Sequence, residues 1–191
     1  MKQTGDVMDA LDNLHQRVSI PALQEPAPTP EQLDNMYRAA LRAPDHGAIR
    51  PWRFLNVQGD ARVKLGQLFA KAAMLKDPEL SEERLAKFQA MPLRAPLLII
   101  AIAKTKEHPK VPHSEQLISA GCAVQNMLLA AHAQDLGAMW RTGDMAYDET
   151  VHQGLELSEG EEIVGYLYLG TPARSRKVPQ LDIDKFVSDW S

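Results

Sequence analysis

The stretch PLLIIAIAK at residues 96–104 decides the fold of this chain. Leucine, isoleucine and alanine fill it without a polar interruption, a proline precedes it and a lysine closes it. An apolar run of this length without alternation is typical of a strand that is buried on both faces. We therefore expect residues 97–103 to form a strand near the centre of a sheet.

Helical and extended segments are expected on either side of this strand. Proline and glycine punctuate the loops between them, and the Pro-rich stretch from Pro21 to Pro30 excludes regular helix. The spacing of apolar residues predicts helices over 7–17, 30–43, 60–91 with a break at 77–78, 114–134 and 145–155, and extended segments over 53–58, 138–140 and 163–169.

The composition indicates a single domain over residues 1–191. The chain has 45% hydrophobic and 24% charged residues, close to the globular average. Its last residues, 173–191, contain a basic cluster and then an apolar tip, and they are expected to form a C-terminal arm that packs on a partner subunit.

Several classes of protein are excluded by the same numbers. The single cysteine, Cys122, leaves no disulfide framework and favours the cytoplasm. The longest apolar run, residues 95–103, is too short to span a bilayer, and residues 1–10 hold no apolar signal core. A net charge of −4 gives no general attraction to nucleic acid. We expect neither a membrane nor a nucleic-acid partner.

No familiar catalytic signature is present, whether a nucleophile elbow, a phosphate-binding glycine loop or a His-Glu-x-x-His pair. His108 and His113 are expected to have structural or solvent roles, and no metal site is predicted. Arg50 and Arg53 are expected to be surface charges. The sequence therefore points away from catalysis by a protein nucleophile or a bound metal.

An arginine beside a hydroxyl residue recurs where a segment ends. The pattern appears at Arg17-Val18-Ser19 and at Arg141-Thr142, and Arg42 and His46 flank a third segment end. Arginine offers charge and a fork of donors, and hydroxyl and backbone groups add more donors, so the combination suits a phosphate. Each arginine alone is better explained by a solvated surface position.

Together these segments resemble the FMN-dependent nitroreductase family, and within it the small single-domain branch of NAD(P)H nitroreductases. The resemblance covers residues 8–172 in the family's order. It is carried by RVS at 17–19, APDH at 43–46, PWRF at 51–54, the small-residue helix from Ser119, LGAMWRTG at 136–143 and the last strand ending GTP at 170–172. The chain departs from the larger family at Ala48 and Arg50, where asparagine and glutamine are common.

The resemblance implies an α+β fold with a mixed central sheet flanked by helices, a core over residues 8–172, and a homodimer with FMN in clefts at its interface. Carried over by position, the FMN contacts are Arg17, Val18, Ser19, Arg42, His46, Trp140, Arg141 and Thr142, and Ala130 is a position that meets the nicotinamide nucleotide. Arg42 and His46 are candidates for contacts from the other subunit.

The implied activity is a ping-pong oxidoreductase reaction. NADH or NADPH delivers hydride to the flavin and leaves, and an electron-poor small molecule such as a nitroaromatic or a quinone is then reduced. Two alternatives stay open: a flavin-binding or regulatory module without turnover, and a reductase of another acceptor, such as an activated alkene or a dehalogenation substrate. Trp52 and Trp140 are explained at least as well by core or interface packing as by shielding a flavin.

Overall fold

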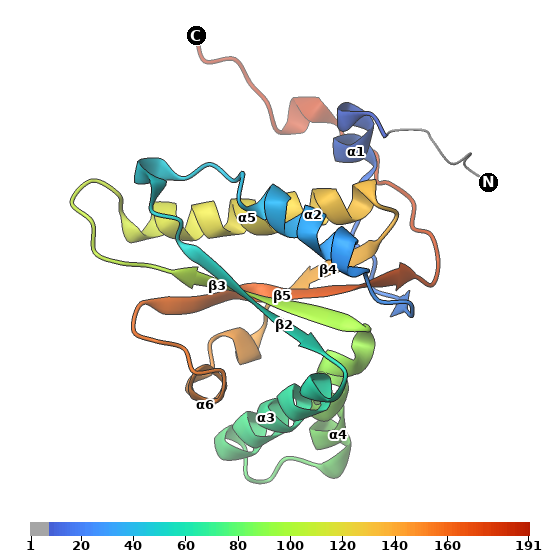
Figure 1. Ribbon diagram of the computed structural model, residues 1–191, viewed down its shortest axis with the longest axis vertical. Coiled ribbons are helices and arrows are strands. Elements are labelled where there is room, and N and C mark those ends of the chain that lie inside the picture. Colours follow the sequence, from blue (N-terminus) through green and yellow to red (C-terminus); the bar gives the residue numbers. More distant parts are fainter. Residues whose placement is uncertain (1–7) are drawn as a thin grey trace.

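The computed structural model of the protein describes residues 8–191 and builds them around one sheet (Figure 1). Its strands are β1 (Leu23–Gln24), β2 (Trp52–Gln58), β3 (Leu97–Lys104), β4 (Gly137–Arg141) and β5 (Glu161–Pro172). They are ordered β1-β5-β3-β2, and β4 pairs with β5. The strand at residues 97–103 is confirmed, and it lies inside the sheet between β5 and β2.

The pairing of the strands differs from the mixed sheet that was expected. Every pair recorded among residues 8–191 is antiparallel. Between β2 and β3 the reason is the excursion through α3 (Asp60–Lys76) and α4 (Glu82–Ala90), which returns the chain to the end of the sheet where β2 stopped. Gln58, the last residue of β2, is therefore paired with Leu97, the first residue of β3.

Strand β3 contributes alternate side chains to two hydrophobic clusters, one on each face of the sheet. Leu97 and Ile99 pack in a cluster with residues of α2 (Pro30–Ala40) and α5 (His113–Ala133). Leu98 and Ile100 pack on the opposite face with residues of α3 and α6 (Glu149–Gly154). Figure 1 shows these helices as layers above and below the sheet, so the prediction of a strand buried on both faces is confirmed.

The helix ends follow local capping chemistry. At α2, Thr29 and Gln32 form a reciprocal capping box and Pro30 occupies the first turn. The predicted break at 77–78 separates α3 from α4. The helix expected over 145–155 is instead η3 (Asp144–Ala146) followed by α6, because the Asp148 carboxylate accepts the first amides of a new helix.

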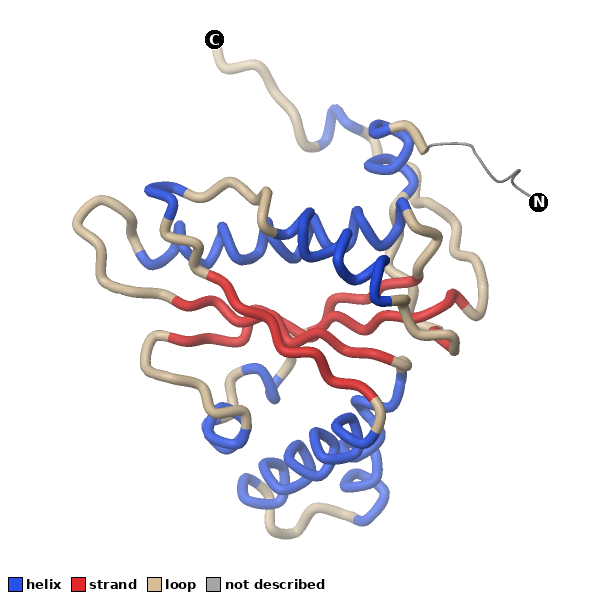
Figure 2. Tube along the Cα trace, in the orientation of Figure 1, coloured by secondary structure: helices blue, strands red, loops and turns tan. Residues whose placement is uncertain are grey.

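The remaining helical segments are short or lie near the termini (Figure 2). Helix α1 (Ala10–Gln16) begins after its N-cap Asp9, and Val7, where the helix was expected to start, lies outside the described residues. The 3-10 turns are η1 (His46–Ala48), η2 (Met91–Arg94) and η4 (Ile183–Lys185). Strand β1 was not expected, because it is two residues long and lies in the Pro-rich stretch.

The expectation that Arg53 is a surface charge is wrong. Its Nε and Nη2 donate to Oε1 and Oε2 of Glu161, each at 2.6 Å, and the Glu161 side chain is 4% exposed. This bidentate pair connects β2 with the start of β5. The partners are 108 residues apart, so no local pattern could reveal the pair.

The C-terminal residues lie away from the sheet. In Figure 1 the chain beyond β5 passes α1 and ends above the helical layer. Its apolar side chains are exposed, with Leu181 at 70%, Phe186 at 73% and Trp190 at 100%. Across residues 8–191, no helix combines the length and the apolar character that crossing a membrane requires.

Candidate functional site

The edge strand β4 brings two of the predicted segments together. Among residues 8–191, β4 pairs only with β5. The Ile20 N–H donates to the Ala138 carbonyl of β4 at 2.9 Å, which places residues 17–19 next to the start of that strand. Arg141 and Thr142 lie at its other end, about 10 Å further along at roughly 3.3 Å per residue. Both arginine and hydroxyl pairs therefore border the same strand.

Two adjacent side chains of β4 point to opposite faces of the sheet, because strands alternate. The Trp140 indole lies on the α5 side, where its Nε1 donates to the Val164 carbonyl at 3.1 Å. The Arg141 guanidinium lies on the other side, with its Cζ 5.8 Å from the centre of the Tyr168 ring. Trp140 thus has a packing role within the chain, whereas Arg141 borders a cavity.

Residues of the C-terminal segment join the first group. Arg176 Nη1 donates to the Ser19 carbonyl at 3.1 Å. A cavity of about 380 Å³ beside this contact is lined by Val18, Arg174 and Arg176, together with Asp135. Sequence reasoning noticed the basic cluster after the last strand but did not assign it to the site. The signal was its position directly after GTP at 170–172.

The charges at this end of β4 suit an anion. Within residues 8–191, no hydrogen bond or ion pair is recorded for the side chain of Arg17 or of Arg174. Arg176 donates from one guanidinium nitrogen to a backbone carbonyl, and within residues 8–191 no ion pair is recorded for it, although Asp135 lines the same cavity. Arg174 and Arg176 line the same cavity, and guanidinium groups can bind phosphate there through charge and a fork of donors.

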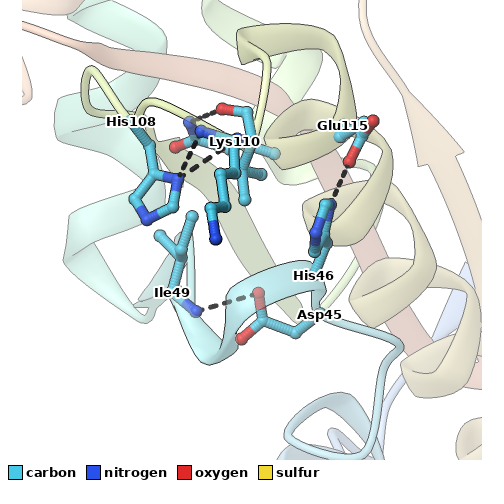
Figure 3. Close-up of polar contacts among 8 residues, drawn as sticks. Asp45, His46, Ile49, His108, Lys110 and Glu115 are labelled. Carbon is cyan, nitrogen blue, oxygen red and sulfur yellow. Dashed lines mark hydrogen bonds and ion pairs between the residues drawn. The ribbon is translucent and has the colours of Figure 1, made fainter.

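His46 lies at the opposite end of α5, whereas Arg42 follows α2, where its N–H donates to the Ala39 carbonyl at 3.0 Å. His46 Nδ1 is 2.6 Å from Oε2 of Glu115, in the first turn of α5 (Figure 3). Asn13, four residues before Arg17, donates from Nδ2 to the Leu129 carbonyl near the last turn. Fourteen residues of helix separate Glu115 from Leu129, or about 21 Å at 1.5 Å per residue. Within one chain, His46 therefore does not meet residues 17–19.

The loop that carries His46 is held by its own polar contacts. The Asp45 carboxylate accepts the amides of Ile49 at 3.1 Å and Arg50 at 2.7 Å, and Figure 3 shows the first of these bonds. Ala48 and Arg50 have φ of 51° and 54°, a backbone region that disfavours side chains other than glycine or asparagine. The Asp45 bonds compensate for this conformation at the two positions where the chain departs from the larger family.

His108 also acts within a loop of the structure, as expected. Its Nδ1 accepts the amides of Lys110 and Val111 at 3.2 and 3.1 Å (Figure 3). His113 Nε2 lies 2.5 Å from Oε1 of Glu162.

Ala130 lies near the C-terminal end of α5, half-buried against the α2–α5 cluster. Its carbonyl accepts a hydrogen bond from Gln134 Nε2 at 2.9 Å. Of the two groups, it belongs to the end of α5 that carries residues 17–19.

Comparison with known proteins assigns the fold and these segments to one family. The model of the Nitroreductase family matches residues 14–171. This chain belongs to the nitroreductase family. The matched range contains every predicted contact residue from Arg17 to Thr142, whereas Arg174 and Arg176 lie beyond it.

Individual nitroreductases agree with this assignment in sequence and in structure. The "Putative NAD(P)H nitroreductase YdjA" of Escherichia coli K12 is 43% identical over 165 residues, covering 86% of this chain and 89% of the relative. A nitroreductase-like protein from Bacillus cereus superposes with a TM-score of 0.79 at 22% identity, over 100% of this chain and 98% of the other. A nitroreductase from Desulfovibrio desulfuricans, solved in complex with FMN, superposes with a TM-score of 0.73 at 22% identity, over 95% and 96% of the two chains.

Proposed function

We propose that this nitroreductase is an FMN-dependent NAD(P)H oxidoreductase that reduces electron-poor acceptors such as nitroaromatics or quinones. The observation that carries the proposal is the meeting of residues 17–19 with Arg176 beside β4, whose other end is Arg141-Thr142. The Escherichia coli relative with its NAD(P)H nitroreductase name and the FMN complex from Desulfovibrio desulfuricans support it.

The cation-rich end of β4 suits the phosphate of FMN. Arg174 and Arg176 provide guanidinium donors at the cavity, Arg17 is the third donor that we propose, and the Ser19 hydroxyl and nearby backbone amides add neutral donors. The opposite end of β4 offers the backbone of Arg141 and Thr142 to the flavin ring. The proposed arrangement thus orients the cofactor along the strand, with its phosphate near Ser19.

FMN supplies hydride transfer in this proposal, in a ping-pong sequence between NADH or NADPH and the acceptor. The chain's residues bind and orient the cofactor and stabilise negative charge next to Arg141. No protein nucleophile takes part, in agreement with the missing catalytic signatures. Ala130, at the same end of α5 as residues 17–19, is proposed to border the nicotinamide nucleotide.

A homodimer completes the proposed site. His46 lies about 21 Å along α5 from the first group, so a second chain is the source we propose for its contact and for that of Arg42. The exposed apolar residues of the C-terminal arm are proposed to pack on that second chain. The unit in each subunit is a single domain, and cytoplasmic location is part of the proposal.

The test is reconstitution of the purified full chain with FMN, followed by anaerobic addition of NADH or NADPH. We expect the FMN to stay bound through gel filtration and its oxidised absorbance band to bleach on addition of the nucleotide. Retained FMN that neither nucleotide reduces would leave a flavin-binding module without turnover. A panel of nitroarenes, quinones, activated alkenes and halogenated aromatics then separates the classes of acceptor by their rates of flavin reoxidation.

A further inference from the structure

A second cavity lies on the other side of β4, between the sheet and the α4–η2 segment. Its volume is about 540 Å³, within the range of small-molecule sites. Arg141, Thr142 and Tyr168 line it from the sheet side, and Phe88, Met91 and Arg94 line it from α4 and η2. Two of these residues, Arg141 and Thr142, also belong to the edge of β4 assigned to the flavin.

The Tyr168 hydroxyl is available to a ligand in this cavity. Tyr168 is 5% exposed, yet no hydrogen bond of its hydroxyl is recorded among residues 8–191. Two residues earlier, the Tyr166 hydroxyl donates to the Met145 carbonyl at 2.9 Å. Among the described residues, Arg62 Nε is the one fully buried side-chain N or O atom without a hydrogen-bond partner. The Tyr168 hydroxyl is not such an atom, so part of its surface is still open to the cavity.

The charges of two arginines, Arg94 and Arg141, act on the Tyr168 hydroxyl. Burial raises the pKa of Tyr168 above its ordinary value, and the nearby charges of Arg94 and Arg141 oppose this rise. The hydroxyl is therefore a neutral donor at neutral pH, and the Arg141 Cζ lies 5.8 Å from the centre of the same ring. The charged side chains that line the cavity are those of Arg94, Arg141 and Asp144, which gives the lining a formal net charge of one positive unit.

The chemistry of the lining selects a planar aromatic anion. Guanidinium groups pair with carboxylates through parallel hydrogen bonds, and aromatic and thioether walls bind a flat ring. A larger cavity of about 1070 Å³ elsewhere is lined by Lys106 and by three glutamates, Glu107, Glu159 and Glu162, so its formal charge is negative and disfavours an anion. Of these two cavities, only the one beside Arg141 offers paired cations and an aromatic wall.

We propose that this cavity binds an aromatic carboxylate, with the carboxylate at Arg94 and Arg141 and the ring against Phe88 and Met91. Resting on the proposed function, this makes a nitroarene that carries a carboxylate the preferred acceptor. The first two-electron step consumes one NAD(P)H and one proton: the nitro group loses an oxygen as water and becomes a nitroso group, and NAD(P)H becomes NAD(P)⁺.

The test compares para-nitrobenzoate with its methyl ester, which keeps the ring and the nitro group and removes the charge. Calorimetric titration into the oxidised, FMN-loaded full chain measures binding without turnover. We expect the acid to bind at least about tenfold more tightly than the ester, the scale of one charge-assisted hydrogen bond. Equal affinity for the two compounds would overturn the proposal.

Two variants assign the preference to Arg94. Arg94→Ala is expected to lower the affinity for the acid about tenfold and to leave that for the ester unchanged. Arg84→Ala, which removes an exposed arginine of α4 paired with Asp77 at 3.5 Å, is the matched control and is expected to change neither. Loss of affinity for both compounds in Arg94→Ala, or an equal loss in the control, contradicts the proposal.

Two further readouts separate this inference from the proposed function. FMN affinity is expected to be the same in Arg94→Ala and in the unaltered chain, and a weaker FMN complex would assign the cavity to the cofactor instead. The calorimetric comparison is also run on protein without FMN, where acid binding is expected to persist. Should FMN fail to bind or to be reduced, the proposed function fails on its own, while the apoprotein titration still decides whether the cavity selects the acid.

Discussion

The arginines of this nitroreductase differ in what surrounds their charge. Arg53 is held by a buried carboxylate, and Arg38 pairs with Asp34 on an exposed helix face. Arg17, in contrast, has no hydrogen bond or ion pair recorded for its side chain within residues 8–191, and it precedes the Ser19 carbonyl that Arg176 contacts. An arginine side chain without a recorded partner among these residues is suited to a bound anion.

Replacement of Arg17 by alanine is expected to weaken FMN binding by on the order of 1.5–3 kcal/mol, because a charge-assisted contact with the phosphate is lost. Fluorescence titration of the apoprotein with FMN measures this change. Arg38→Ala serves as the control, since an exposed pair contributes little. Unchanged FMN affinity in the Arg17 variant would remove this residue from the site.

The pair of Arg53 and Glu161 predicts a dependence of stability on pH. Hydrogen bonds and charge from Arg53 hold the pKa of Glu161 below its ordinary value. A carboxyl group whose pKa is lower in the folded state stabilises the fold above its unfolded pKa, and this contribution disappears as the pH falls through the folded pKa.

Glu161→Gln is therefore expected to lower the free energy of unfolding by about 1–3 kcal/mol at neutral pH. The difference between the variant and the unaltered chain should narrow as the pH falls through the lowered pKa of Glu161 in the folded state, because the carboxyl then becomes protonated in the unaltered chain as well. Urea denaturation across this pH range measures both quantities. A difference that stays constant with pH would exclude the ion pair as its cause.

At the scale of elements, a glycine of β5 and a glycine of α5 leave room for the Trp140 side chain of β4. A Cβ at Gly165 of β5 would lie 2.1 Å from the Trp140 Nε1. At Gly121 of α5, the nearest atom to a Cβ is the Trp140 Cη2 at 3.8 Å, an ordinary contact. The indole thus determines how closely β5 approaches β4, and through β4 the position of Arg141 and Thr142.

Gly165→Ala is expected to destabilise the protein by about 1–3 kcal/mol, because the added methyl group forces the indole or the strand to move. Gly121→Ala, on the other side of the same indole, is the matched control. It is expected to be neutral or stabilising, since alanine is the better helix former and has room. Thermal or chemical unfolding measures both variants, and equal destabilisation of the two would contradict this view of the packing.

At the scale of the whole molecule, the long helix α5 separates His46 from residues 17–19. His46 and Glu115 meet at its first turn, and Asn13 contacts its last turns. The C-terminal arm exposes Leu181, Phe186 and Trp190 to solvent. Association of two copies of the chain, as the proposed function requires, would bring His46 of one copy to residues 17–19 of the other and would cover the apolar arm.

Removal of residues 178–191, which leaves Arg174 and Arg176 in place, is expected to shift the protein from dimer toward monomer at micromolar concentrations. Burial of apolar side chains is the largest favourable contribution in such an interface. Sedimentation velocity measures the shift. Phe186→Asp in the full chain should act in the same direction, whereas Asp189→Ala, a polar change on the same arm, should not. An unaltered dimer after truncation would exclude the arm from the interface.

Local sequence determined the parts of this protein that depend on neighbouring residues. The apolar run at 97–103, the Thr29-Pro30 start of α2 and the break at 77–78 were predictable, because burial on two faces, helix capping and proline geometry leave marks within a few positions. The segments at 17–19 and 140–142 were identified on a different basis, namely their order along the chain and their similarity to a family.

Only the tertiary structure decided how distant residues combine. It paired Arg53 with Glu161 and brought Arg176 to Ser19. It also separated His46 from residues 17–19 by most of the length of α5. Contacts across more than a hundred residues depend on the path of the whole chain, and no local pattern of side chains encodes that path.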